Sequence, residues 1–302
     1  MTATSDLIIE RRRIRRRLAF WRILAIVALA AAIIVLIPRP SGGVRGEHVA
    51  RITISGIIVD DPDRDAALTR IADDTNARAL VVRINSPGGT VAGSEALYES
   101  LRAVSQEKPV VAVMSEAAAS GGYVAAIAAD HIVARATTLT GSIGVVAEAP
   151  NVAGLLDHLG IEVMRTKSAP LKAEPSFLTE PEDGSIAAQQ ALIDDSFAWF
   201  RDLVAERRGL AGDGLAAVTD GRAFTGRQAL GLGLVDTIGG EEAARAWLDS
   251  ERGVAESLKI RDWNWDEPEL PWPFTGIEES LLGGAPLEHL LGAGPRLFAV
   301  IQ

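Results

Sequence analysis

Cysteine is absent from this chain of 302 residues, and only four histidines are present. Without cysteine, the chain can form neither disulfide bonds nor thiolate metal sites. The four histidines are widely separated in the sequence, so no two of them have the spacing of a local metal-binding motif; they are His48, His131, His158 and His289. We therefore expect no metal site and no dependence on the redox state of the compartment.

Charge is distributed unevenly along the chain. The 30 Lys and Arg against 40 Asp and Glu give a net charge of −10. Residues 1–17 nevertheless contain six arginines, all within residues 11–17, and only Asp6 and Glu10 oppose them in this segment. An arginine-rich arm of this kind can bind nucleic acid. Here it adjoins an apolar segment and a strongly acidic remainder, so we expect a membrane partner and no nucleic acid.

Residues 18–37 form a long apolar run whose single charge is Arg22. At about 1.5 Å per residue, a helix of this length spans the hydrocarbon core of a bilayer. The run exceeds the usual core of a cleaved signal peptide, and no small-residue cleavage site follows it. We predict an uncleaved, single-pass anchor in the inner (plasma) membrane. The arginines orient it with residues 1–17 in the cytoplasm and the main domain in the periplasm, or otherwise outside the cytoplasm.

After a linker over residues 38–46, short apolar runs alternate with helical patterns. This alternation predicts an α/β domain over residues 47–250, built from stacked βαβ units around a parallel sheet. Residues 251–302 are predicted to be a separate tail containing tryptophan and proline. Its aromatic residues either pack on the domain or a neighbouring subunit, or lie at the membrane interface. The strands are expected at residues 48–59, 79–84, 110–114, 131–134, 140–146 and 162–165, and the helices at 65–73, 91–105, 122–129, 151–159 and 185–208.

The most informative motif is Ala-Ala-Ala-Ser-Gly-Gly-Tyr at residues 117–123, which lies between two apolar runs. A serine at a strand-to-helix turn among small residues can expose its hydroxyl while backbone N–H groups surround it. An acyl-transfer nucleophile needs this environment, so Ser120 is our candidate. The rival serines Ser86, Ser94 and Ser115 fit better as turn or helix-face residues.

Three further small-residue segments accompany this motif. Together, and in this order, the four segments resemble the bacterial signal peptide peptidase A family, whose members are membrane-anchored Ser/Lys-dyad proteases with a Clp-protease/crotonase-like fold. The resemblance covers roughly residues 47–245. The other three segments are Asn-Ser-Pro-Gly-Gly at 85–89, Thr-Gly-Ser-Ile-Gly at 140–144, and Gly-Arg-Ala-Phe-Thr-Gly at 221–226 with the glycine-rich stretch that follows at 229–236.

The resemblance assigns a role to individual residues. It implies that Ser120 is the nucleophile and that Ser142 supports the base. The base lies in a segment of the form Lys-Ser-Gly-x-x-Lys, which corresponds here to residues 167–172 and places it at Lys172. This segment has Ala in place of the glycine and Pro after it, and Lys167 is the alternative base.

The chemistry agrees with these roles. A lysine amine acts as a general base only when neutral, which requires burial and loss of water to lower its pKa from roughly 10.4. The hydroxyl of Ser142 could orient the amine, as an aspartate orients histidine in the usual triad. N–H groups of Gly88 or Gly89 and of Gly121 would form the oxyanion hole. No cofactor is needed.

The resemblance therefore implies a serine endopeptidase that degrades remnant signal peptides through an acyl-enzyme and assembles into a ring or dome of identical subunits. One alternative is a catalytically idle scaffold of the same fold that binds envelope partners, but Ser120, Ser142 and Lys172 are all present. Another is a crotonase-type acyl-CoA enzyme, which would lack CoA outside the cytoplasm. A Ser–His–Asp triad is disfavoured because His131 and His158 fit better as structural residues.

Overall fold

The computed structural model describes residues 21, 22, 24, 25, 27, 29 and 46–265. The chain divides into two units, Met1–Arg45 and Gly46–Gln302. In the first unit the six described residues are helical. The predicted cytoplasmic arm and the rest of the predicted anchor lie outside the described residues. Among the residues described, no helix combines the length and the apolar character needed to cross a bilayer.

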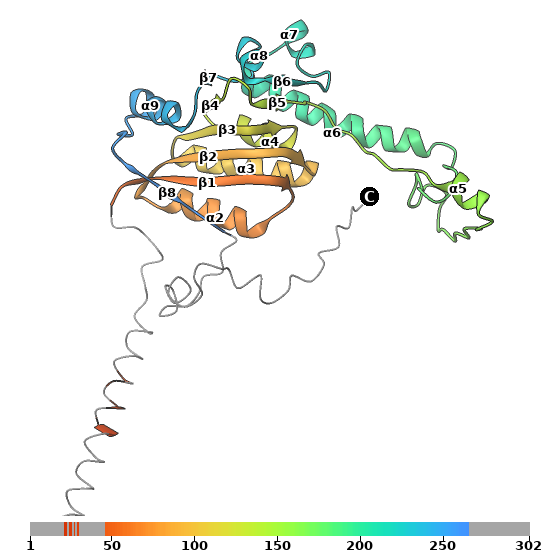
Figure 1. Cartoon of the computed structure of the whole chain (residues 1–302), viewed down its shortest axis with the longest axis horizontal. Helices are drawn as coiled ribbons and strands as arrows, with labels where there is room; N and C mark the ends of the chain where they lie inside the picture. The colour runs from red at the N-terminus through yellow and green to blue at the C-terminus, as the bar shows by residue number, and fades with distance from the viewer. Residues whose placement is uncertain (1–20, 23, 26, 28, 30–45, 266–302) are drawn as a thin grey trace, which may run out of the picture. The chain divides into compact units, whose positions relative to one another are not determined.

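A mainly parallel sheet forms the centre of the second unit (Figure 1). Its main path runs β6-β5-β3-β2-β1-β8, and β4 pairs with both β3 and β7. Every pair is parallel except β5 with β6. The strands are β1 (His48–Ile58), β2 (Ala77–Gly89), β3 (Val110–Ala119), β4 (His131–Ala134), β5 (Leu139–Gly141), β6 (Ala223–Thr225), β7 (Thr237–Ile238) and β8 (Lys259–Asp262).

Helices cover both faces of this sheet. Leu80 and Val82 of β2 belong to the core under α2, α3 and α4, whereas Val81 belongs to the core under α9. Because both faces are covered, the central strands are continuous apolar runs rather than alternating ones. The helices are α2 (Pro62–Asp73), α3 (Val91–Glu107), α4 (Gly121–Ile127), α5 (Ala153–His158), α6 (Ser185–Arg208), α7 (Gly212–Ala216), α8 (Gly226–Gly231) and α9 (Glu241–Arg252).

The predicted alternation of strands and helices is confirmed, and the fold is mixed α/β with a parallel-rich sheet. One predicted strand is wrong: residues 162–165 are irregular, and none of the strands that the structure describes pairs with them. In the segment predicted as a tail, β8 joins the sheet beside β1. Trp263 and Trp265 pack against the core, and Trp265 Nε1 donates to Asp61 Oδ2 at 2.8 Å. Trp272 lies outside the described residues.

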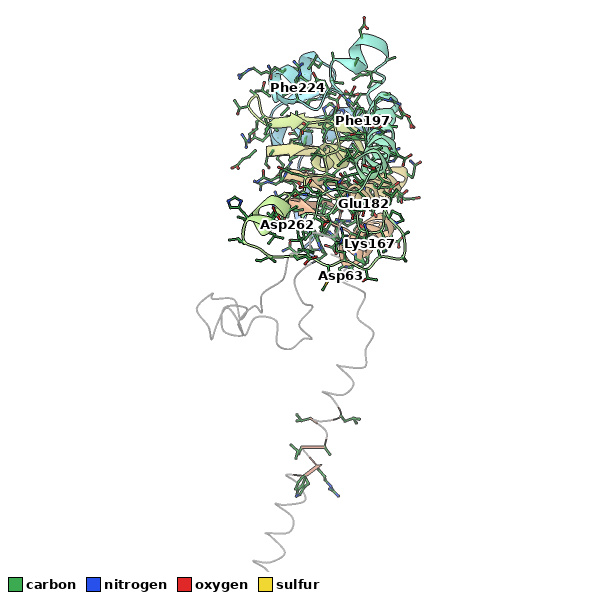
Figure 2. All side chains as sticks on the ribbon, turned by 90° about the vertical axis from the view of Figure 1, so that its right-hand side faces the viewer. Asp63, Lys167, Glu182, Phe197, Phe224 and Asp262 are labelled. Atoms are coloured by element: carbon green, nitrogen blue, oxygen red, sulfur yellow. The ribbon has the colours of Figure 1, made fainter. Side chains whose placement is uncertain are left out.

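Residues 146–192, here called the arm, differ from the rest of the unit, here called the body. Figure 1 shows the chain after β5 running beside α6 to reach α5, before it returns to the start of α6. Figure 2 labels Lys167 and Glu182 in the arm and Phe197 on the helix that returns to the body.

The apolar face of α6 is buried only toward its C-terminal end. Phe200 and Val204 are buried, but Ile186 and Leu192 are 59% and 72% exposed. The arm exposes many large apolar side chains: Val146, Leu155, Leu159, Ile161, Met164, Leu171, Phe177, Leu178, Ile186 and Leu192.

Candidate active site

Ser120 occupies a strained turn between the end of β3 and the start of α4. Its φ of 52° and ψ of −121° lie in a region that favours glycine, and such a conformation costs about 1–3 kcal/mol in a residue with a side chain. The turn is held by its neighbours. Ser120 N–H donates to the Gly141 carbonyl at 2.9 Å, and the Ser120 carbonyl accepts from Tyr123 N–H and Val124 N–H.

Helix α4 anchors this turn from the other side, because all seven of its residues are buried. The Tyr123 hydroxyl, which is fully buried, donates to the Leu234 carbonyl at 2.9 Å. Burial raises the pKa of Tyr123 far above its ordinary value, so this hydroxyl remains a donor. The buried helix and sheet thus fix a strained serine in one orientation.

Close backbone approach explains the glycines around Ser120. A Cβ on Gly88, whose φ is 119°, would lie 2.8 Å from Ser120 Cβ. A Cβ on Gly121 would lie 2.1 Å from Ser94 Oγ and 3.2 Å from Gly89 N. Only glycine at these positions allows the end of β2 to lie against the start of α4.

This approach leaves two backbone N–H groups available near Ser120. Ile58 is opposite Gly89 in the β1–β2 ladder, and its carbonyl accepts from Thr90 N–H at 2.9 Å. In a parallel ladder, a residue forms its hydrogen bonds with the two residues that flank the one opposite it. Ile58 therefore bonds to the residues on either side of Gly89, and Gly89 N–H points away from β1. Gly121 is the first residue of α4, and a first N–H has no partner within its own helix. Gly88 N–H instead donates to Ser86 Oγ at 3.1 Å, which favours Gly89 over Gly88 as an oxyanion donor.

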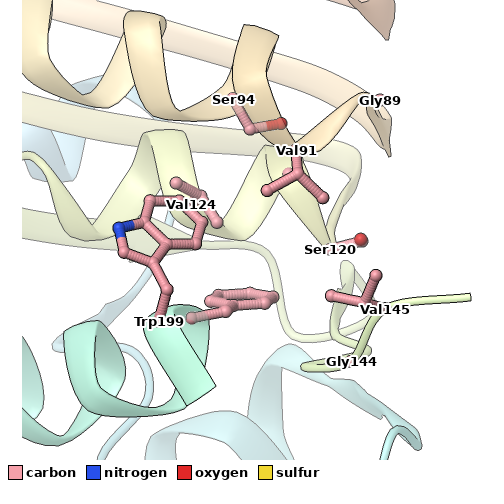
Figure 3. A pocket seen from close by; sticks show the side chains of 10 residues that line it. Gly89, Val91, Ser94, Ser120, Val124, Gly144, Val145 and Trp199 are labelled. Carbon is pink, nitrogen blue, oxygen red and sulfur yellow. The ribbon is translucent and has the colours of Figure 1, made fainter. Parts of the chain in front are cut away.

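A small pocket opens beside Ser120 (Figure 3). Figure 3 shows the Ser120 hydroxyl between Val91 and Val145, with Val124 and Trp199 further inside. None of the described residues that line the pocket has an ionisable side chain, so the pocket suits an uncharged group. Its lining residues are Gly89, Val91, Ser94, Ser120, Gly121, Val124, Gly144, Val145, Trp199 and Phe200.

The sequence reasoning did not identify this apolar lining as part of the site. Trp199 and Phe200 are adjacent in the helix predicted over residues 185–208. The adjacent aromatic pair near the end of an amphipathic helix was the available signal. It could not be distinguished from ordinary core packing without the position of Ser120.

The backbone just before Ser142 lies beside the Ser120 turn. Ser142 follows β5, has a φ of 50°, and its N–H donates to the Arg222 carbonyl at 2.9 Å. The residue before it, Gly141, accepts the Ser120 N–H. The structure therefore brings the turns of Ser120 and Ser142 together, although Ser142 itself does not line the pocket.

Lys172 lies elsewhere in this chain. It is exposed, belongs to the arm and is not among the pocket-lining residues. Lys172 precedes α6, which begins at Ser185, and Phe200 of the pocket lies fifteen positions after Ser185. At 1.5 Å per residue this corresponds to about 22 Å along the helix. In a single chain, the described residues that line the pocket beside Ser120 therefore do not include Lys172.

The two candidate lysines differ in their contacts. Lys167 Nζ lies 2.9 Å from Glu174 Oε1 and 3.0 Å from Glu182 Oε1. Its hydrogen bond with Glu174, followed by that with Glu182, raises the pKa of Lys167 above its ordinary value, so this amine remains protonated. Lys172 has no ion-pair partner among the described residues.

The other rival groups have structural contacts. His131 stacks on Trp247 with ring centroids 4.6 Å apart, and burial lowers the pKa of His131. Ser86 is fully buried and donates to the Gly56 carbonyl at 2.6 Å, and Ser94 donates to the Thr90 carbonyl at 2.8 Å. Ser115 accepts from Arg83 Nε, and His158 lies exposed on α5.

Comparison with known proteins identifies relatives of the whole domain. The family model "Peptidase family S49" matches residues 102–255. The chain is 43% identical over 239 residues to a Synechocystis protein whose name classes it provisionally as a protease, covering 78% of this chain and 85% of that protein.

Two longer relatives also match. The chloroplastic serine protease SPPA of Arabidopsis thaliana is 33% identical, with 70% of this chain and 32% of that protein covered. Protease 4 of Salmonella typhi is 32% identical, with 73% of this chain and 36% of that protein covered. The chain thus spans about a third of the length of these two proteins.

Proposed function

This chain belongs to peptidase family S49 and is a serine peptidase, and we propose that it cleaves peptides with Ser120 as nucleophile and Lys172 as general base. The observation that carries this proposal is the strained, buried turn that directs Ser120 into an apolar pocket beside two available N–H groups. Membership of a peptidase family disfavours both the idle scaffold and the acyl-CoA enzyme.

The proposed reaction uses an ordinary acyl transfer. Ser120 Oγ attacks the scissile carbonyl while the neutral Lys172 amine accepts its proton. Gly89 N–H and Gly121 N–H stabilise the resulting oxyanion, and loss of one such donor typically costs 10²–10³ in rate. The lysine then protonates the leaving amine, and water, activated by the same amine, hydrolyses the acyl-enzyme. The Ser142 hydroxyl orients the amine.

We propose that Lys172 reaches Ser120 from a neighbouring copy in a homo-oligomeric ring or dome. Two features support this arrangement. Lys172 is exposed in its own chain and outside its own pocket, whereas a lysine base must be desolvated. The arm that carries it exposes an extended apolar surface, and surfaces of this kind mark protein interfaces.

Mixing two inactive variants tests this arrangement. Ser120→Ala retains Lys172, and Lys172→Ala retains Ser120. If the dyad forms between copies, co-assembled variants should regain about a quarter to a half of the wild-type rate, because some sites then contain both groups. If the dyad forms within one chain, the mixture stays inactive. Light scattering on the mixture checks that assembly occurs.

The proposed substrates are extended, apolar peptides, including signal peptides left in the membrane after secretion. The uncharged pocket lining supports an apolar residue at the cleavage site, and the arginines before residues 18–37 support an anchor that holds an extracytoplasmic domain beside such substrates. Cleavage of alanine- and leucine-rich peptides should exceed that of charged peptides of equal length. A preference for charged peptides would contradict this assignment.

A further inference from the structure

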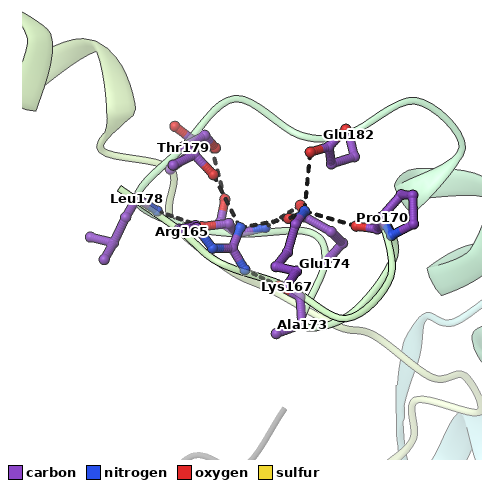
Figure 4. A network of polar contacts seen from close by, with 10 residues as sticks. Arg165, Lys167, Pro170, Ala173, Glu174, Leu178, Thr179 and Glu182 are labelled. Carbon is purple, nitrogen blue, oxygen red and sulfur yellow. Dashed lines mark hydrogen bonds and ion pairs between the residues drawn. The ribbon is translucent and has the colours of Figure 1, made fainter. Parts of the chain in front are cut away.

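A buried carboxylate lies beneath the turn that carries Lys172 (Figure 4). The side chain of Glu174 is only 1% exposed. Its Oε1 accepts from Arg165 Nη1 and from Lys167 Nζ, and its Oε2 accepts from the Ser176 N–H at 3.1 Å. Lys167 and then Arg165 hold the pKa of Glu174 below its ordinary value. Glu174 is therefore ionised at neutral pH and binds two cations.

The two cations also bind backbone carbonyls on opposite sides of Lys172 in the sequence. Lys167 Nζ donates to the Pro170 carbonyl at 2.8 Å, and Arg165 Nη2 donates to the Ala173 carbonyl at 2.8 Å. Lys172 N–H closes the turn between them by donating to the Ala169 carbonyl at 3.1 Å. We call Arg165, Lys167 and Glu174 the clamp.

The clamp compensates for the lack of packing around this turn. Residues 168–173 are all exposed, and Ala173 has a φ of 56°, which an alanine rarely adopts. A turn with so few buried apolar contacts would otherwise sample several conformations. The charge-assisted hydrogen bonds of the clamp select one of them, and none of these bonds uses the Lys172 side chain.

We propose that Glu174 is a positioning residue for the reaction: through Arg165 and Lys167 it fixes the turn that presents the Lys172 amine to the Ser120 hydroxyl. This inference rests on the function proposed above. A misplacement of about 1 Å between reacting groups can lower a rate by about 10²-fold. The clamp should therefore affect turnover rather than substrate binding, because the pocket is formed by other residues.

Glu174→Gln tests the proposal, because it keeps the shape of the side chain and removes its charge. We expect kcat to fall by about 10- to 10²-fold while KM stays within about twofold. Glu182→Gln is the matched control. It removes the same charge from the same Lys167, but Glu182 is 49% exposed and does not contact Arg165. Its kcat should stay within about twofold of wild type.

A second variant guards against failure of the arm to fold or assemble. Arg165→Lys keeps a positive charge beside Glu174, but a lysine lacks the planar fork needed to reach the carboxylate and the Ala173 carbonyl together. We expect it to assemble normally, as judged by light scattering, and to lose kcat with KM unchanged. Assembly lost in parallel with kcat in both variants would overturn the positioning role, because the clamp would then act through assembly alone.

The results separate this inference from the function on which it rests. If Lys172→Ala is inactive and Glu174→Gln turns over at the wild-type rate, the clamp has no positioning role and the dyad stands. If Lys172→Ala itself retains activity, the dyad is wrong. A loss of kcat in Glu174→Gln that Glu182→Gln does not share, with the oligomer intact, supports the clamp.

Discussion

The turn of Ser120 and the turn of Lys172 each contain a residue with positive φ, but they are held by different forces. Around Ser120, a buried sheet and the fully buried helix α4 fix the backbone. Around Lys172, the chain is exposed and charged side chains bond its carbonyls. Packing fixes the first turn, and electrostatics fixes the second.

This difference indicates how the two halves of the site respond to their surroundings. The Ser120 turn depends on contacts within the body, which are present in a single chain. The arm contributes few buried side chains, and Leu192 and Met164 are 72% and 90% exposed. The neighbouring copy that we propose would cover this apolar surface and give the arm the packing it lacks. We therefore expect substitutions in the body and the arm to fail in different ways.

The largest effect should come from the body. Ser120→Ala removes the nucleophile, and activity should fall by about 10⁴- to 10⁶-fold. Ser94 is the other serine among the described pocket residues, and its hydroxyl already donates to the Thr90 carbonyl. The melting temperature should change little, since alanine fits the same space and the same backbone. Labelling with a fluorophosphonate should disappear in this variant. Retained labelling or activity would rule out Ser120 as the nucleophile.

Ser120→Gly sharpens this test. Glycine adopts a φ of 52° without strain, so this variant should be inactive yet more stable than Ser120→Ala by about 1 kcal/mol. Chemical denaturation of both variants measures the difference. Equal stability of the two would mean that the turn stores no strain.

A smaller effect should come from the arm. Met164→Asp places a charge on the exposed apolar surface, where it should disturb contact with a neighbouring copy but leave the body folded. We expect partial loss of the oligomer and a fall in activity of about 10- to 10²-fold at low protein concentration, recovering as concentration rises. Sedimentation across a dilution series measures both assembly and activity.

Leu230→Asp provides the comparison from the body, where Leu230 is 42% exposed on α8. This substitution should leave assembly unchanged if the arm is the interface. Equal loss of assembly in Met164→Asp and Leu230→Asp would contradict a special role for the arm.

The body was predictable from the sequence because its signals are local and repeated. Apolar runs ending in small residues located β2, β3 and the Ser120 turn, and the order of four glycine-rich segments led to the family. The close approach of Gly88 to Ser120 follows from the same pattern, since only glycine fits there.

The arm was less predictable because its stability depends on contacts that sequence periodicity does not encode. A strand is predicted at residues 162–165, but a strand requires a neighbour to pair with. The role of Glu174 depends on two cations seven and nine positions earlier in an irregular loop. The segment from Arg165 to Glu174 forms neither a helix nor a strand, so only the folded loop reveals that these three positions meet.

The smallest effect should be a change of selectivity at the pocket that the sequence did not reveal. Trp199 comes from α6, the helix that links arm and body, and lines the pocket with Val124. Trp199→Ala should enlarge the pocket, so the ratio of kcat/KM for peptides with leucine and with alanine at the cleavage site should shift about tenfold toward leucine. Trp247→Ala, a change of the same size on α9 where the ring stacks on His131, should leave that ratio unchanged even if stability falls. If this ratio is unchanged in Trp199→Ala, the substrate side chain that precedes the scissile bond binds outside this pocket. It would then bind beside the Ser120 turn in a groove formed mainly by the neighbouring copy.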